Sequence, residues 1–157
     1  MALQLPPHAS ADSYADLATA DAYLTGEVWK TLTIGVKESL LRRATELLDD
    51  LDWRGRKNTE QENALVWPRY GMYDREGILL DDESVPVFLQ RATCRLALHL
   101  YDNEPGITGD QDISELKVGS VSLKFEETVQ SIATIPDYIK KMFRYYTKNR
   151  GFGIERA

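Results

Sequence analysis

Two long apolar stripes at helical spacing constrain this fold more than any other feature of the sequence. In residues 35–52 and again in 84–103, apolar side chains recur at intervals that place them on one face of an α-helix. The first stripe is Leu40, Leu41, Ala44, Leu47, Leu48 and Leu51, and the second is Val85, Phe88, Leu89, Ala92, Leu96 and Leu100. Because each stripe must be buried against another element, we expect packed helices.

Two further helices and a hairpin complete the prediction. A short helix is predicted from about Ala20 to Gly26 with Thr19 as its N-cap, and Ser84 is the expected cap of the second long helix. A last helix should begin after Thr134, with an apolar face that runs from Ile135 to Tyr146. Residues 116–127 alternate between apolar and polar side chains around a Gly-Ser pair, which predicts a β-hairpin.

The predicted fold class is therefore mainly α. We expect a small bundle of about four helices with an inserted β-hairpin at about 116–127 and an extended C-terminal tail. The expected organisation is a flexible N-terminal arm (1–12), one helical domain (13–148) and the tail (149–157).

Composition and charge exclude several classes of protein. The 157 residues carry a net charge of −6, which argues against a chain whose main task is to grip phosphate. The single cysteine, Cys94, cannot form an internal disulfide. The sequence has no long apolar run and no signal peptide, so we expect no contact with a membrane. Residues 78–133 have net charge −6 and residues 134–157 have +4, which fits either contacts between copies or a solvated surface.

The sequence contains no recognisable catalytic constellation. Cys94 falls on the apolar side of a predicted helix, and His8 and His99 lie far apart without metal-ligand spacing. The acidic run 81–83 precedes a helix start, where the helix dipole favours negative charge. We therefore expect a protein that is not an enzyme and has no metal or cofactor.

The segment 53–77 supports two interpretations. Its basic and aromatic residues could bind single-stranded DNA, with Arg54, Arg56, Lys57 and Arg69 on phosphates and Trp53, Trp67, Tyr70 or Tyr73 stacked on bases. Alternatively the tryptophans cover the ends of helices, which we favour because they adjoin apolar stripes. The predicted core residues are then Trp53, Trp67, Leu47, Leu48, Phe88, Leu96 and Phe143. Residues 58–69 have the pattern of a single helical turn ended by Pro68.

A specific set of motifs resembles a known family. Ala-Asp-Ala-Tyr (20–23) precedes a helix that runs through Leu48-Asp49 into Trp-Arg-Gly-Arg-Lys (53–57). Trp-Pro-Arg (67–69) follows, and then Pro86 and the stretch from Ala92 to Ala97. Over roughly residues 13–130 the chain resembles the phage-encoded family often labelled DnaT-like single-stranded-DNA-binding, and it is similar to head–tail adaptors of tailed phages.

The adaptor resemblance implies a structural virion protein of the head–tail junction, made in the host cytoplasm. It implies a ring of about twelve copies beneath the portal protein that extends the DNA channel and docks a tail or nozzle protein. Double-stranded DNA would pass through this channel without specific binding. The residues then expected to contact a neighbouring subunit or the portal are Arg54, Arg56, Lys57, Arg69, Lys140, Lys141, Arg144, Phe152 and Ile154. The alternatives are single-stranded-DNA binding through 53–73 and a regulatory helical domain that binds no DNA.

Overall fold

The chain folds mainly into helices, as predicted. A computed structural model describes residues 2–103 and 135–148. Its helices are α1 (Leu17–Tyr23), α2 (Glu27–Thr31), α3 (Ile34–Asp49), α4 (Val87–Asn103) and α6 (Asp137–Phe143), and a 3-10 turn (Arg144–Tyr146) follows α6. The predicted hairpin at 116–127 and the predicted tail at 149–157 lie outside the described residues.

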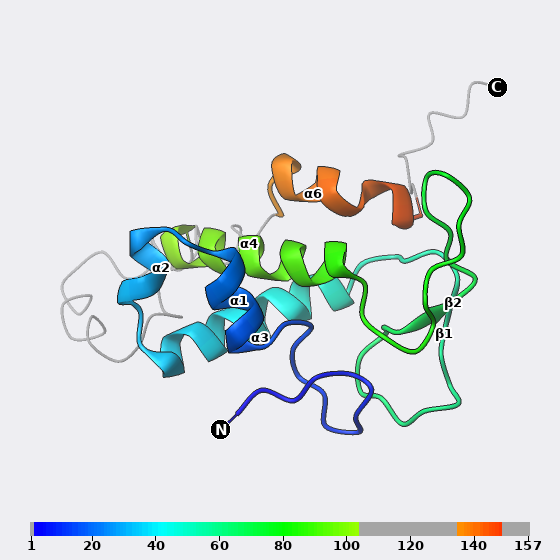
Figure 1. Cartoon of the computed structure of the whole chain (residues 1–157), viewed down its shortest axis with the longest axis horizontal. Coiled ribbons are helices and arrows are strands. Elements are labelled where there is room, and N and C mark those ends of the chain that lie inside the picture. The colour runs from blue at the N-terminus through cyan, green and yellow to red at the C-terminus, as the bar shows by residue number, and fades with distance from the viewer. Residues whose placement is uncertain (1, 104–134, 149–157) are drawn as a thin grey trace, which may run out of the picture.

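The two predicted stripes form the centre of the core. α3 packs along α4, α1 packs against both, and α6 lies on the other side of α4 (Figure 1). The fully buried apolar side chains of these two helices are Leu40, Leu41, Ala44 and Leu48 on α3 and Leu89, Ala92, Cys94, Leu96, Ala97 and Leu100 on α4. α4 is therefore covered by helices on more than one side, which explains why its apolar face is the wider of the two.

Three helix starts differ from those predicted. Asp16, rather than Thr19, caps α1, and its carboxylate accepts from the Thr19 N–H at 2.7 Å. The Ser84 hydroxyl donates to Asp81 instead of capping α4. α6 begins at Asp137, directly behind Pro136, so its proline precedes the first turn rather than lying in it.

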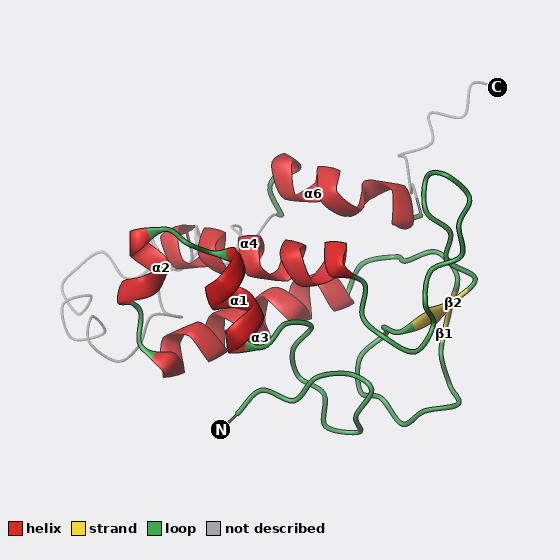
Figure 2. Cartoon of the chain, viewed as in Figure 1, coloured by secondary structure: helices red, strands yellow, loops and turns green. Residues whose placement is uncertain are grey.

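A two-stranded antiparallel sheet, which the sequence did not predict, lies beyond the end of α3. β1 (Arg56–Lys57) pairs with β2 (Arg69–Tyr70), as Figure 2 shows. Gly55 precedes β1 with a φ of 69°, and a Cβ there would lie 2.2 Å from the Tyr70 carbonyl oxygen. Only glycine allows this close approach of the two chain segments.

The helical turn predicted in 58–69 is wrong. The Asn58 side chain accepts from the Glu60 N–H, and Asn63 accepts from the Leu65 N–H and donates to the Trp67 carbonyl. Such local side-chain bonds give the backbone an alternative to helix. The segment is therefore an irregular connection held by asparagines.

The N-terminal segment has specific partners in the domain. The Gln4 N–H donates to Asp12 at 2.8 Å, and Asp12 pairs with Arg42 of α3 at 2.7 Å. The His8 carbonyl accepts from the Ala64 N–H at 3.1 Å, and Ala11 is buried. These bonds connect the predicted arm to α3 and to the 53–77 connection.

One polar cluster joins α1, α2 and α3. The Asp21 carboxylate accepts from the Trp29 indole N–H and from Lys37, each at 2.8 Å, and the Lys37 ammonium lies 5.4 Å from the Trp29 ring centre. Trp29 is buried, and the bond to Asp21 satisfies the only hydrogen-bond donor of its side chain. Hydrogen bonding from Lys37, followed by that from Trp29, holds the pKa of Asp21 below its usual value.

This cluster predicts an acid-sensitive contribution to stability. A carboxyl whose folded pKa is depressed stabilises the fold above its unfolded value, and that stabilisation is lost as pH falls through the folded pKa. Asp21→Asn should therefore lower the thermal midpoint at pH 7, and the difference from the parent should shrink below about pH 4. Thermal melts by circular dichroism from pH 7 to pH 2 measure it. A difference that stays constant across this range would contradict the assignment.

Candidate functional site

The two tryptophans of the 53–77 segment are buried. Trp53 is 3% exposed and Trp67 is fully buried, and their rings meet edge to face with centroids 5.3 Å apart. Trp53 also contacts Phe143 of α6, and Trp67 contacts Phe88 of α4, at centroid distances of 5.4 and 5.9 Å. Neither ring is available to stack on a base, so this part of the DNA-binding interpretation does not fit the structure.

The remaining predicted core residues are all buried or partly buried. Leu48, Leu96 and Phe143 are buried, while Leu47 and Phe88 are partly buried and pack against the core. The Phe88 ring stacks parallel on Tyr146 at 4.1 Å. The end of α3, the start of α4 and α6 thus meet at one aromatic cluster.

Backbone bonds attach the end of α6 to the start of the connection. The Arg54 N–H donates to the Tyr146 carbonyl at 2.9 Å, and the Lys148 N–H donates to the Asp52 carbonyl at 2.7 Å. The Trp53 indole donates to the Leu48 carbonyl at the end of α3. Residues 52–54 and 146–148 are therefore held side by side, although they are far apart in sequence.

Two of the predicted contact residues, Arg69 and Lys57, have internal partners. The Arg69 guanidinium donates to the carbonyls of Arg54, Gly55 and Val66 at 2.8, 3.0 and 3.3 Å. Lys57 donates to the Asn63 carbonyl at 2.7 Å. Burial lowers the pKa of Arg69. Through these bonds both cations support the irregular connection.

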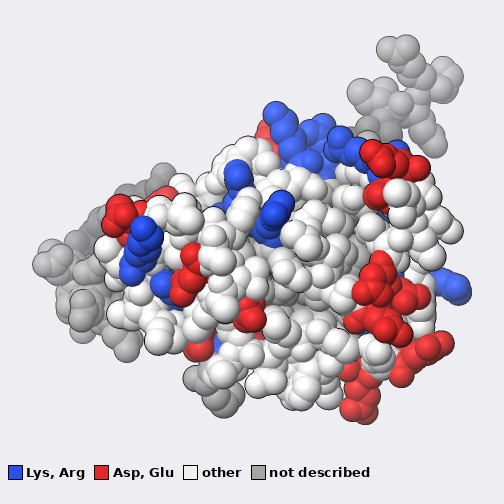
Figure 3. Space-filling model, in the orientation of Figure 1, with Lys and Arg blue, Asp and Glu red and all other residues white. Residues whose placement is uncertain are grey.

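The other predicted basic residues are exposed, and most of them gather at α6. Lys140, Lys141 and Arg144 project from α6 and its 3-10 turn, and Figure 3 shows Lys and Arg side chains over this helix. Arg54 is brought to the same place by the pairing with residues 146–148. Arg56 is also exposed but lies on β1. Phe152 and Ile154 lie outside the part of the chain that the structure describes.

A tyrosine that sequence reasoning missed lies among these cations. The guanidinium carbons of Arg54 and Arg75 are 5.4 and 6.0 Å from the Tyr145 ring centre. Tyr145 is partly exposed, whereas its neighbour Tyr146 packs on Phe88. Helical spacing could have predicted this difference, because it places Tyr146 on the apolar face of the last helix and Tyr145 beside that face. We call Arg54, Arg75, Lys140, Lys141, Arg144, Tyr145 and Lys148 the α6 surface.

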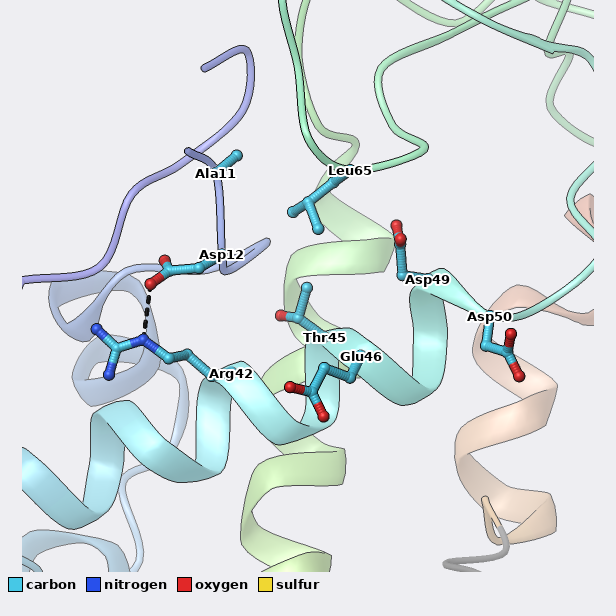
Figure 4. A pocket seen from close by; sticks show the side chains of 8 residues that line it. All are labelled: Ala11, Asp12, Arg42, Thr45, Glu46, Asp49, Asp50 and Leu65. Carbon is cyan, nitrogen blue, oxygen red and sulfur yellow. Dashed lines mark hydrogen bonds and ion pairs between the residues drawn. The ribbon is translucent and has the colours of Figure 1, made fainter. Parts of the chain in front are cut away.

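A hollow on the described part of the molecule has the opposite character. It measures about 430 Å3 between the N-terminal segment and α3, and Figure 4 shows its acidic lining of Asp12, Glu46, Asp49 and Asp50 beside Arg42. Asp49 accepts from the Tyr14 hydroxyl and from the Val66 N–H, so it joins α3 to two loops. Burial, with the nearby Asp49 charge, raises the pKa of Tyr14. An acid-lined hollow of this kind repels phosphate.

The one cysteine of the chain lies in the core. Cys94 is fully buried and burial raises its pKa to about 12, which makes its thiol a poor nucleophile. Over residues 2–103 and 135–148, no three His, Cys, Asp or Glu side chains cluster to hold a metal ion. None of the described helices has both the length and the apolar character needed to cross a membrane.

Comparison with known proteins adds one finding. A family model described as "Putative DnaT-like ssDNA binding protein" matches residues 6–157, almost the whole chain. No curated protein and no solved structure matches the sequence.

The aromatic cluster predicts a sharp contrast between two aromatic substitutions in the same segment. Trp53→Ala should lower the free energy of unfolding by about 3–5 kcal/mol, because it leaves a cavity between α3 and α6. Tyr73→Ala should change it by less than about 0.5 kcal/mol, because Tyr73 is 54% exposed. Urea unfolding followed by circular dichroism compares the two. Equal losses would show that the Trp53 ring is not a central core residue.

Proposed function

Because this chain belongs to the DnaT-like family, we propose that it binds single-stranded DNA through the α6 surface. The observation that carries the proposal is the partly exposed Tyr145 ring among Arg54, Arg75 and the cations of α6. Proteins that bind single strands combine a cationic track for the backbone with aromatic rings that stack bases. The α6 surface has both components.

Charge supports this location over others on the molecule. Residues 135–148 contain four basic residues and one acidic residue, while the whole chain has net charge −6. Figure 3 shows many acidic side chains toward the β1–β2 end of the molecule, some of them beside the basic cluster, and others spread over the rest of this face. The concentration of cations at α6 would attract a polyanion to that helix without a high overall positive charge.

The structure changes which residues support this proposal. The sequence offered Arg54, Arg56, Lys57 and Arg69 for phosphates and Trp53, Trp67, Tyr70 or Tyr73 for bases. Of these, the two tryptophans, Arg69 and Lys57 have internal partners. Arg54 stays a candidate because its guanidinium carbon faces Tyr145, although its Nε also donates to the Thr147 carbonyl at 3.2 Å. The binding surface is thus centred on α6 and only its edge comes from the 53–77 segment.

The test is a titration of a fluorescently labelled oligo(dT) at two salt concentrations. Affinity should fall as salt rises, since binding to phosphates releases counterions. Lys141→Glu should weaken binding about tenfold at low salt and reduce the salt dependence. The matched control is Lys30→Glu, an exposed lysine on α2, which should bind like the parent. Absence of binding by the parent at low salt, or equal loss in both variants, would reject the proposal.

A second candidate function is favoured by the same separation of charge. Acidic side chains of residues 74–83 and basic side chains of α6 suit contact between copies, as in a ring-forming head–tail adaptor of the kind that the motifs resemble. The proposed partners are then further copies of this chain, a portal protein and a tail protein. Burial of both tryptophans also supports this candidate, because it removes the strongest aromatic argument for DNA contact.

Light scattering of the purified 157-residue chain tests this candidate. A ring predicts a particle of about twelve copies, or a smaller assembly that grows with concentration. Arg56→Glu should leave the thermal midpoint unchanged, because Arg56 is exposed on β1, and should reduce the assembled fraction. A strictly monomeric chain at high concentration, together with tight DNA binding, would leave only the first candidate.

A further inference from the structure

An ordered loop near β2 exposes three large apolar side chains. Tyr73, Ile78 and Leu79 are 54%, 59% and 59% exposed. The loop is held by a bridge between Tyr73 and Leu79, and the Asp74 carboxylate accepts from the Ile78 N–H at 2.9 Å. Gly77, in the turn of this loop, has a φ of 82°. We call residues 73–79 the apolar loop; its exposed side chains are presented on a defined backbone.

Acidic side chains accompany this loop. Glu76 lies at its tip, and Asp81 and Glu83 follow it, all exposed. No base in the described ranges forms an ion pair with any of the three. The apolar loop is therefore an apolar patch bordered by these acids, and its one cation, Arg75, lies toward the Tyr145 ring.

A groove of complementary character lies toward the other end of the molecule. It measures about 260 Å3 and is lined by Tyr23 at the end of α1, by Leu24 and Thr25 after that helix, by Arg95 and Leu98 of α4, and by Tyr138 of α6. We call it the α4 groove. Its walls are largely apolar, and Tyr138 is 51% exposed.

Two arginines border the α4 groove. The guanidinium carbons of Arg91 and Arg95 lie 5.6 and 5.7 Å from the Tyr23 ring centre, and Arg95 Nε donates to the Tyr23 hydroxyl at 2.7 Å. Across residues 2–103 and 135–148, neither arginine pairs with a carboxylate. The border of the α4 groove is therefore positively charged, whereas the acids that border the apolar loop are negatively charged.

We propose that the apolar loop of one copy docks in the α4 groove of a second copy. Ile78 and Leu79 enter the groove, and the acids beside the loop face Arg91 and Arg95. Because the loop and the groove lie toward opposite ends of the molecule (Figure 1), the contact is head-to-tail. Repeated contacts of this type generate a ring if the rotation closes. The proposal rests on the second candidate function, with Arg91 and Arg95 of α4 in place of the α6 bases as partners of the acids, and it does not require DNA binding.

Disulfide trapping between two single variants tests the geometry directly. Glu76→Cys places a thiol on the apolar loop, and Thr25→Cys places one at the exposed edge of the α4 groove. Oxidation of an equimolar mixture should give a crosslinked pair, while either variant alone should not. Ser39→Cys, exposed on α3 outside both surfaces, replaces Thr25→Cys in the control mixture. No crosslink in the first mixture, or equal crosslinking in both, would overturn the proposal.

Self-association measured by sedimentation velocity gives the energetic test. Ile78→Ser should weaken association about tenfold, because it removes one buried apolar side chain from the contact. Ile34→Ser is the matched control, since Ile34 is 66% exposed on α3 away from both surfaces, and it should leave association unchanged. Equal effects of both, or none from Ile78→Ser, would reject the contact.

Two further readouts separate this contact from a groove filled by its own chain and from DNA binding. If residues 104–134 of the same copy fill the groove, the mixture gives no crosslink and the chain does not associate, which overturns the proposal. Oligo(dT) affinity should be unchanged in Ile78→Ser, because Ile78 lies outside the α6 surface. Failure of the DNA proposal and failure of this contact therefore give different results.

Discussion

The contact between the Trp53 and Trp67 rings is the interaction on which the rest of this structure depends. Their edge-to-face packing contributes about 0.5–1.5 kcal/mol beyond the area it buries. Its greater importance is its position, because Phe143 of α6 and Phe88 of α4 pack against the same pair. The connection after α3 thereby fixes how α4 and α6 pack relative to α3.

Fixing α6 in this way also creates the surface that we assign to DNA. The bonds from Arg54 and Lys148 across the paired backbone bring the start of the connection beside the 3-10 turn. Arg54 then reaches Tyr145, which the sequence separates from it by about ninety residues. Burial of the tryptophans and exposure of the cationic surface are thus two consequences of one arrangement.

The sequence predicted the helices well and the connection poorly, for a physical reason. Periodic apolar stripes such as Leu40 to Leu48 report burial directly, and they indicated the mainly helical fold. The β1–β2 pair and the hydrogen bonds of Arg69 depend on contacts between residues that no periodic pattern relates. The asparagine bonds at Asn58 and Asn63 overrode a weak helical pattern, because local side-chain bonding competes with helix formation.

The central claim is that the tryptophans hold the fold while DNA meets a different surface. Intrinsic tryptophan fluorescence during an oligo(dT) titration tests it most directly, since Trp29, Trp53 and Trp67 are all buried. We predict blue-shifted emission that resists acrylamide and stays unquenched while the anisotropy of the labelled oligonucleotide rises. Tryptophan emission that is quenched in proportion to bound DNA would contradict this claim.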